Sequence, residues 1–153
     1  MLQSVGNVLI KKPHTSQSWS KEQIDQFTLC INDPIYFIKS FCYIQHPVKG
    51  KVPFALFDYQ EKLILTYDDY RYAIAMLPRQ TGKSTAAAAY LLWYCMFKPD
   101  STVLIAAHKY AGAQEIMQRV RFIYEMLPGW IKAGCTSYNR GSIEFDNASR
   151  IVS

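Results

Sequence analysis

The sequence lacks most of the features that mark membrane, secreted or metal-stapled proteins. Its longest uncharged apolar run, Ala86–Phe97, is well short of the roughly 20 residues that span a bilayer. Residues 1–10 lack the basic start and the long apolar segment of a secretory signal. The four cysteines form no Cys-x-x-Cys pair, as is typical of reduced cysteines in a core. We therefore expect a protein of a reducing, cytosolic compartment with no membrane partner.

Charge of one sign is not concentrated anywhere in the chain. The 153 residues include 17 Lys and Arg against 12 Asp and Glu, a formal net charge of +5. Residues 1–52 hold six lysines and three acids, and the remainder holds eleven basic and nine acidic residues, so the excess is split +3 and +2. Because no basic stripe results, charge is weak evidence for a nucleic-acid partner. Half of the residues are apolar, which is enough for a core without disulfides.

Helix-start signals recur in the first half of the chain. Ser20, with Gln23 three residues later, predicts a capping box. Asp33 followed by Pro34 predicts a second helix, because proline loses nothing at the first helical position. Asp58, with Glu61 three residues on, predicts a third start capped by Asp58.

The stretch His46–Pro53 contains prolines and a glycine and cannot continue a helix. We interpret it as an extended connector and as the best internal boundary. Residues 1–53 then form an N-terminal helical region with its connector, and residues 54–153 form a second part.

Within this second part, the spacing of apolar residues alternates between that of strands and that of helices. Strand-like and helix-like patterns alternate, and a strand–helix–strand–helix order predicts an α/β fold built on a parallel sheet with right-handed crossovers. The expected elements are a strand at Tyr72–Leu77, a helix over Ala86–Phe97, a strand at Thr102–Ala107 and a helix over residues 113–123.

The segment before the long helix reads Leu77-Pro-Arg-Gln-Thr-Gly-Lys-Ser-Thr85, which is typical of a phosphate-binding P-loop. Gly82 has no Cβ, so its backbone can approach a phosphate closely. Lys83 would reach the β- and γ-phosphates, and the Ser84 hydroxyl would ligate Mg²⁺. The backbone N–H groups from Gln80 and Thr81 to Thr85 would point into one concavity at a helix N-terminus. Leu77 stands where the usual motif has glycine, so an incidental Gly-Lys-Ser turn is the alternative.

Two further features suit a nucleotide site. Tyr59-Gln60 lies upstream of the loop, and a glutamine carboxamide can pair with adenine N6 and N7, which would select ATP over GTP. The alternative is a solvated glutamine on a helix. Arg79, inside the loop, is a candidate to neutralise charge on the γ-phosphate. Its alternative role is a structural ion pair.

Taken together, these residues resemble the large terminase subunits of tailed phages, the ATPases that pump double-stranded DNA into empty capsids. The resemblance covers most of the chain and is closest to the T4-like branch. In that family the first P-loop glycine is commonly absent, so Leu77 agrees with the pattern. The segments that carry the resemblance are Asp33–Phe37, Ile44–Pro47, Leu56–Gln60, Arg79–Ser84, Ala106–Lys109 and Asn139–Glu144.

The resemblance implies a P-loop NTPase of the RecA/ASCE-like class, with ATP and Mg²⁺ as cofactors. Lys83 and Ser84 would hold phosphate and Mg²⁺, and Arg79 would act with Lys83 in catalysis. Tyr59 and Gln60 would form the adenine-reading motif. The implied partners are double-stranded DNA, the capsid portal and the small terminase subunit. The complete protein would work as an oligomer on the portal, in the host cytoplasm at the procapsid.

The last residues predict a hairpin over 136–145, followed by a strand at Arg150–Val152. An ATPase of this class also needs an apolar strand ending in adjacent acids, and none follows the loop here. The segment Leu63–Asp69 is also apolar and ends in adjacent acids, but it precedes the loop. We therefore interpret its acids as a solvated helix end. We therefore expect the front part of a terminase, truncated before the Walker B strand, with negligible hydrolysis on its own.

Other functions fit the same residues. A non-catalytic nucleotide-binding or assembly module would bind ATP without turnover. A helicase or another P-loop translocase would share the loop without any dependence on capsids. A purely structural scaffold would bind no ATP at all.

Overall fold

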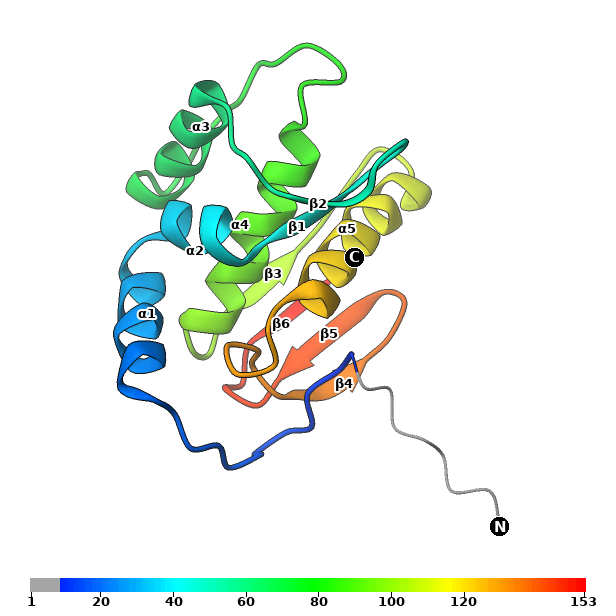
Figure 1. Ribbon diagram of the computed structural model, residues 1–153. Helices are drawn as coiled ribbons and strands as arrows, with labels where there is room; N and C mark the ends of the chain where they lie inside the picture. Colours follow the sequence, from blue (N-terminus) through cyan, green and yellow to red (C-terminus); the bar gives the residue numbers. More distant parts are fainter. Residues whose placement is uncertain (1–8) are drawn as a thin grey trace.

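A computed structural model of the chain describes residues 9–153, which adopt a mixed α/β fold (Figure 1). Within these residues there are five helices, a two-stranded sheet and a four-stranded sheet. The elements, in chain order, are α1 (Lys21–Asn32), α2 (Pro34–Phe41), β1 (Tyr43–His46), β2 (Gly50–Pro53), α3 (Asp58–Asp69), α4 (Lys83–Phe97), β3 (Thr102–Leu104), α5 (Tyr110–Met126), β4 (Cys135–Tyr138), β5 (Ser142–Phe145) and β6 (Arg150–Val152).

The first two helices begin where the sequence predicts. The Ser20 hydroxyl accepts from the Gln23 N–H at 3.2 Å, and the Gln23 carboxamide accepts from the Ser20 N–H at 3.0 Å, which completes the capping box of α1. Asp33 caps α2 by accepting from the N–H groups of Ile35 and Tyr36. Both caps satisfy backbone donors that have no partner inside the helix.

The start of α3 differs from the sequence prediction by one residue. Phe57 is the N-cap, and Asp58 is already helical. The phenylalanine side chain cannot accept a hydrogen bond, so the Gln60 carboxamide caps this end by accepting from the Phe57 N–H at 3.1 Å. The predicted Asp58 cap was therefore wrong, because Gln60, three residues after Phe57, supplies the acceptor.

The stretch expected to be a plain connector belongs to an antiparallel hairpin. β1 and β2 pair from Tyr43 opposite Pro53 to His46 opposite Gly50. Gly50 has a φ of 69°, the left-handed conformation that lets the chain turn back here. The boundary proposed at residue 53 stays a prediction.

The parallel sheet predicted from the strand–helix–strand order is not present among residues 9–153. The run from residue 72 to 77 pairs with no strand, and Ile74 and Met76 are 94% and 92% exposed. β3 does form a parallel pair, but its partner is β6, and β5 pairs with both β6 and β4 in the antiparallel sense. An apolar run predicts extended backbone, but it does not determine which strand will lie beside it. The predicted hairpin and last strand are confirmed as β4, β5 and β6.

Helix α4 lies at the centre of the molecule and contacts α2, α3, α5, β3 and β6 (Figure 1). Its C-terminal end is held by the turn between β5 and β6. The Asn147 side chain donates to the carbonyl groups of Cys95 at 2.8 Å and Met96 at 3.2 Å. The Ser149 hydroxyl donates to the Lys98 carbonyl at 2.8 Å. These bonds satisfy carbonyl groups that a helix end leaves without partners.

The cysteines are reduced and buried, as the sequence predicted. Burial raises the pKa of the Cys30 and Cys95 thiols to about 12 and that of Cys135 to about 11. The pKa of Cys42 is also raised well above its ordinary value by burial. No helix among residues 9–153 combines the length and the apolar character needed to cross a bilayer.

These thiols predict a loss of stability at alkaline pH. An unfolded thiol ionises near pH 8.5, whereas the folded thiols stay neutral to much higher pH, so their stabilising effect is complete below that value and falls as the pH rises. For the four buried thiols together we expect the free energy of unfolding to drop by on the order of 2–3 kcal/mol between pH 7 and pH 9. Urea unfolding followed by circular dichroism under reducing conditions measures this. An equal urea midpoint at both pH values would contradict it.

Candidate phosphate-binding site

The loop of residues 78–82 joins the extended segment to α4 and has two residues in the left-handed region. Gly82, the N-cap of α4, has a φ of 71° and a ψ of 12°. Gln80 has a φ of 63°. Glycine adopts this region freely, whereas a residue with a Cβ incurs roughly 1–2 kcal/mol. The same region is occupied at His14, Asp100 and Ala148, so the backbone angles alone do not mark a site, and the polar groups around the loop are needed as well.

Lys83 is the first residue of α4, and its side chain folds back over the loop. Its Nζ donates to the carbonyl oxygens of Leu77 at 2.9 Å and Pro78 at 3.1 Å. The Thr81 hydroxyl donates to the same Pro78 carbonyl at 3.1 Å. An ammonium group has three donors, so one remains for a ligand. The positive charge is thus held at the start of the loop and does not extend into solvent.

The first turn of α4 presents free backbone donors. The Gly82 carbonyl accepts from the N–H groups of Thr85 at 3.1 Å and Ala86 at 2.9 Å. In contrast, the N–H groups of Gly82, Lys83 and Ser84 donate no hydrogen bond to any of the residues that the structure describes. The dipole of this 15-residue helix adds partial positive charge at the same end. Together with the Lys83 ammonium, these groups suit an anion with several oxygens.

Two residues of α3 contact the loop from its side. The Tyr59 hydroxyl donates to the Thr81 carbonyl at 2.8 Å, and Gln60 Nε2 donates to the same oxygen at 3.0 Å. Gln60 is only 3% exposed, and its Oε1 accepts the Phe57 N–H. The structure therefore brings Tyr59 and Gln60 against the loop. Adenine reading by these residues stays a prediction.

The other predicted site residues also lie on the loop or the first turn of α4. Arg79 is exposed and forms no ion pair with an acid among the described residues, so the structural ion pair considered as its alternative role is not formed. Ser84 and Thr85 are half-buried. Across residues 9–153 there is no group of three or more His, Cys, Asp or Glu side chains that could hold a metal ion. Ser84 as a Mg²⁺ ligand stays a prediction.

The acids at the end of α3 are partly engaged in packing. The Tyr90 hydroxyl of α4 donates to Asp68 Oδ1 at 3.3 Å. Burial, with a contribution from the Asp68 charge, raises the pKa of Tyr90. Asp69 is exposed at the last position of the helix. Asp68 is therefore more than the solvated acid that the sequence suggested, because it ties α3 to α4.

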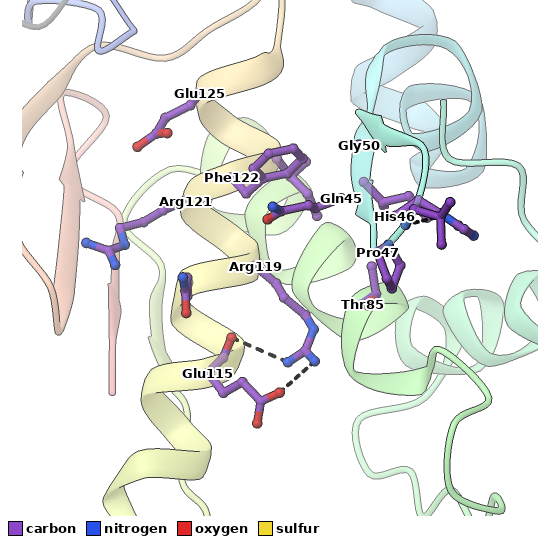
Figure 2. A pocket seen from close by; sticks show the side chains of 14 residues that line it. Gln45, His46, Pro47, Gly50, Thr85, Glu115, Arg119, Arg121, Phe122 and Glu125 are labelled. Atoms are coloured by element: carbon purple, nitrogen blue, oxygen red, sulfur yellow. Dashed lines mark hydrogen bonds and ion pairs between the residues drawn. The ribbon is translucent and has the colours of Figure 1, made fainter. Parts of the chain in front are cut away.

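Sequence reasoning missed a groove of about 780 Å³ between the β1–β2 hairpin and α5 (Figure 2). Thr85 lines this groove, which therefore adjoins the first turn of α4. On its α5 side, Arg119 Nη2 donates to Glu115 Oε1 at 2.8 Å. The sequence showed the amphipathic pattern of α5, but it contained no signal that a hairpin would form the opposite wall.

Comparison with known families gives one match that includes this loop. The model of the family described as "Terminase large subunit, T4likevirus-type, N-terminal" matches residues 74–153. The matched part contains the loop, all of α4 and everything that follows.

Proposed function

The chain belongs to the T4-virus-type family of terminase large subunits, in its N-terminal part, and we propose that it binds ATP for a motor that packages phage DNA. The observation that carries the proposal is the geometry around Lys83. Its ammonium is folded over a loop that ends in left-handed Gly82, beside three backbone N–H groups with no partner among the described residues. A triphosphate offers the charge and the number of oxygens that such a site can satisfy.

Each site residue has a specific part in this proposal. The N–H groups of Gly82, Lys83 and Ser84 bind phosphate oxygens, and the Lys83 ammonium contacts the β- and γ-phosphates. The Ser84 hydroxyl, in the first turn of α4, would ligate Mg²⁺, whose charge when bound neutralises that of the phosphates. Arg79 is exposed on the same loop, without an ion-pair partner among the described residues, and is free to approach the γ-phosphate.

We extend the proposal to the partners of DNA packaging on the strength of the family alone. In the complete motor, ATP hydrolysis would drive double-stranded DNA through the capsid portal, with the small terminase subunit delivering the DNA. The family match favours this role over the helicase alternative.

Calorimetric titration of the chain with ATP and Mg²⁺ tests nucleotide binding without requiring turnover. We expect saturable binding by the wild-type protein and affinity weakened by about tenfold to a hundredfold in Lys83→Ala, because a hydrogen bond to a charged group contributes roughly 1.5–3 kcal/mol.

Lys62→Ala is the matched control for that titration, because it removes an exposed lysine from the surface of α3. Its affinity for ATP should equal that of the wild type. Absence of any binding heat at millimolar ATP in the wild type, or equal loss in the two variants, would refute the assignment of the loop as a triphosphate site.

A further inference from the structure

The Thr81 carbonyl accepts the hydrogen bonds that join α3 to the loop. It accepts two hydrogen bonds from consecutive residues, at 2.8 Å from the Tyr59 hydroxyl and at 3.0 Å from Gln60 Nε2. The orientation of the Gln60 amide follows from its partners, because only its oxygen can accept the Phe57 N–H and only its nitrogen can donate to Thr81. Both ends of this buried carboxamide are therefore engaged within the protein.

These bonds determine where a phosphate-binding donor points. The Thr81 carbonyl and the Gly82 N–H belong to one planar trans peptide, so the two groups point in opposite directions. Holding the carbonyl toward α3 therefore turns the Gly82 N–H away from α3. That N–H has no hydrogen-bond partner among the described residues and is one of the three N–H groups, of Gly82, Lys83 and Ser84, proposed to bind phosphate.

The contact is close enough to require a glycine on the loop. A Cβ added to Gly82 would lie 2.6 Å from Gln60 Nε2. The Tyr59 ring is also held in place, because it stacks on Phe57 with ring centroids 5.7 Å apart and planes inclined by 8°. The Gln60 amide and the Tyr59 hydroxyl thus both approach the loop from the N-terminal end of α3.

We propose that Tyr59 and Gln60 are positioning residues for phosphate binding, which fix the Thr81–Gly82 peptide through two hydrogen bonds to the Thr81 carbonyl. This inference rests on the proposed function of the loop, and it adds a role that needs no nucleobase. It follows that both residues control affinity for the phosphate chain itself.

A ligand without a base separates this role from adenine reading. Titration of the wild type and Gln60→Leu with magnesium tripolyphosphate, Mg·ATP and Mg·GTP should show affinity reduced about tenfold for all three, because the variant loses the bond to Thr81 and the cap on Phe57. The ratio of ATP to GTP affinity should stay the same as in the wild type.

Tyr59→Phe is the second variant, and it removes only a hydroxyl from a partly exposed ring. We expect its tripolyphosphate affinity to fall about threefold, with a thermal midpoint lowered by no more than a few degrees. Tyr70→Phe is the matched control, because it makes the same chemical change at the other end of α3, where the ring is 65% exposed and its hydroxyl bonds to no described residue. Should Gln60→Leu fail to fold, this pair of variants still decides the question.

Unchanged tripolyphosphate affinity in Tyr59→Phe, or in a folded Gln60→Leu, would overturn the inference, as would a wild type that binds Mg·ATP but no tripolyphosphate. A change in the ratio of ATP to GTP affinity with constant tripolyphosphate binding would assign both residues to base reading instead. Failure of the proposed function is a separate result, because the wild type would then bind none of the three ligands.

Discussion

Replacing Gly82 by alanine is expected to weaken Mg·ATP binding by about a hundredfold to about a thousandfold. Alanine at a φ of 71° incurs roughly 1–2 kcal/mol of backbone strain. Its Cβ would also lie 2.6 Å from Gln60 Nε2, so the carboxamide must move and give up two hydrogen bonds, at about 1 kcal/mol each. The loop relieves the strain by leaving the binding conformation, and the total of about 3–4 kcal/mol then appears as lost affinity.

Gly50→Ala is the matched control for this change. Gly50 has a φ of 69°, nearly that of Gly82, but an added Cβ would meet nothing within 4 Å. It is the first residue of β2, directly after the hairpin turn, so the same backbone strain arises outside the loop of residues 78–82. Its nucleotide affinity should remain close to that of the wild type, although its unfolding midpoint should fall.

A double-mutant cycle separates the two contributions at Gly82. In a Gln60→Ala background the added Cβ has room, so Gly82→Ala should weaken binding less than it does in the wild type. Calorimetric dissociation constants for the four proteins give the coupling energy. Additive effects would show that the contact between Gln60 and the loop has no role in binding, and an unimpaired Gly82→Ala would remove the glycine from the site altogether.

The parts of the fold that could be predicted are those encoded by residues close together in the sequence. Ser20 with Gln23 predicted the start of α1, and Asp33 with Pro34 predicted the start of α2, because a cap involves residues within one turn. The hairpin of β4 and β5 was predicted for the same reason, since its turn lies between the paired strands.

Long-range pairing could not be predicted in this way. The parallel pair of β3 and β6 joins Thr102 to Arg150, and nothing in either strand specifies the other. The apolar run from residue 72 to 77 has the composition of a strand but no partner among the described residues. Period and propensity specify extended backbone locally, while the order of strands depends on how the helices pack between them.

The candidate site divides along the same line. Gly82, Lys83 and Ser84 could be named from the sequence because the P-loop motif consists of consecutive residues, and phosphate binding by them stays a proposal. The hydrogen bonds from Tyr59 and Gln60 to Thr81 could not be derived, since they require α3 to be packed beside the loop by contacts elsewhere. The groove lined by the hairpin and α5 was missed for the same reason.

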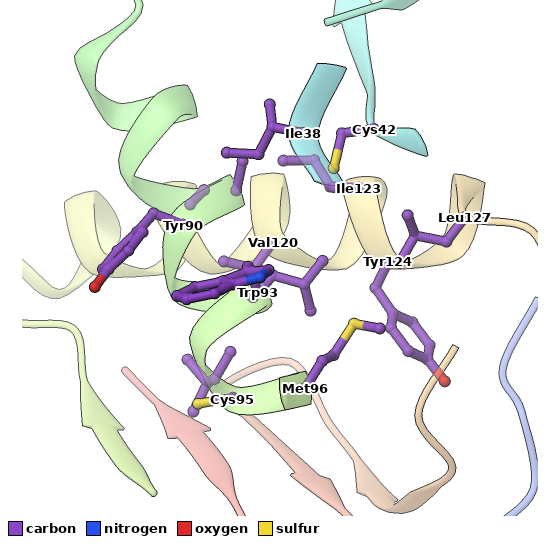
Figure 3. Packing of buried hydrophobic residues seen from close by; sticks show 14 of the residues in the cluster. Ile38, Cys42, Tyr90, Trp93, Cys95, Met96, Val120, Ile123, Tyr124 and Leu127 are labelled. Atoms are coloured by element: carbon purple, nitrogen blue, oxygen red, sulfur yellow. The ribbon is translucent and has the colours of Figure 1, made fainter. Parts of the chain in front are cut away.

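Among the substitutions proposed for this chain, Trp93→Ala should lower the free energy of unfolding the most, by about 3–5 kcal/mol. Trp93 is 1% exposed and lies on α4 among the core side chains of α4 and α5 (Figure 3). Its ring contacts those of Tyr90 and Phe97 at centroid distances of 5.6 Å and 6.4 Å. Its Nε1 donates to the Cys30 carbonyl at 2.6 Å, which ties α1 to α4. Urea unfolding followed by circular dichroism at pH 7 measures the loss without relying on tryptophan fluorescence.

Two companion variants divide this loss between packing and hydrogen bonding. Trp93→Phe keeps most of the ring but leaves the Cys30 carbonyl without its donor, and it should reduce the free energy of unfolding by about 1–3 kcal/mol. Tyr94→Ala changes the neighbouring residue on the same helix, which is 36% exposed, and should have a smaller effect than Trp93→Ala. Because Trp93 lies in the C-terminal half of α4 and the loop precedes its N-terminus, the folded fraction of Trp93→Ala should still bind Mg·ATP with wild-type affinity. A destabilisation below about 1 kcal/mol in Trp93→Ala would mean that the indole is not a structural anchor between α1 and α4.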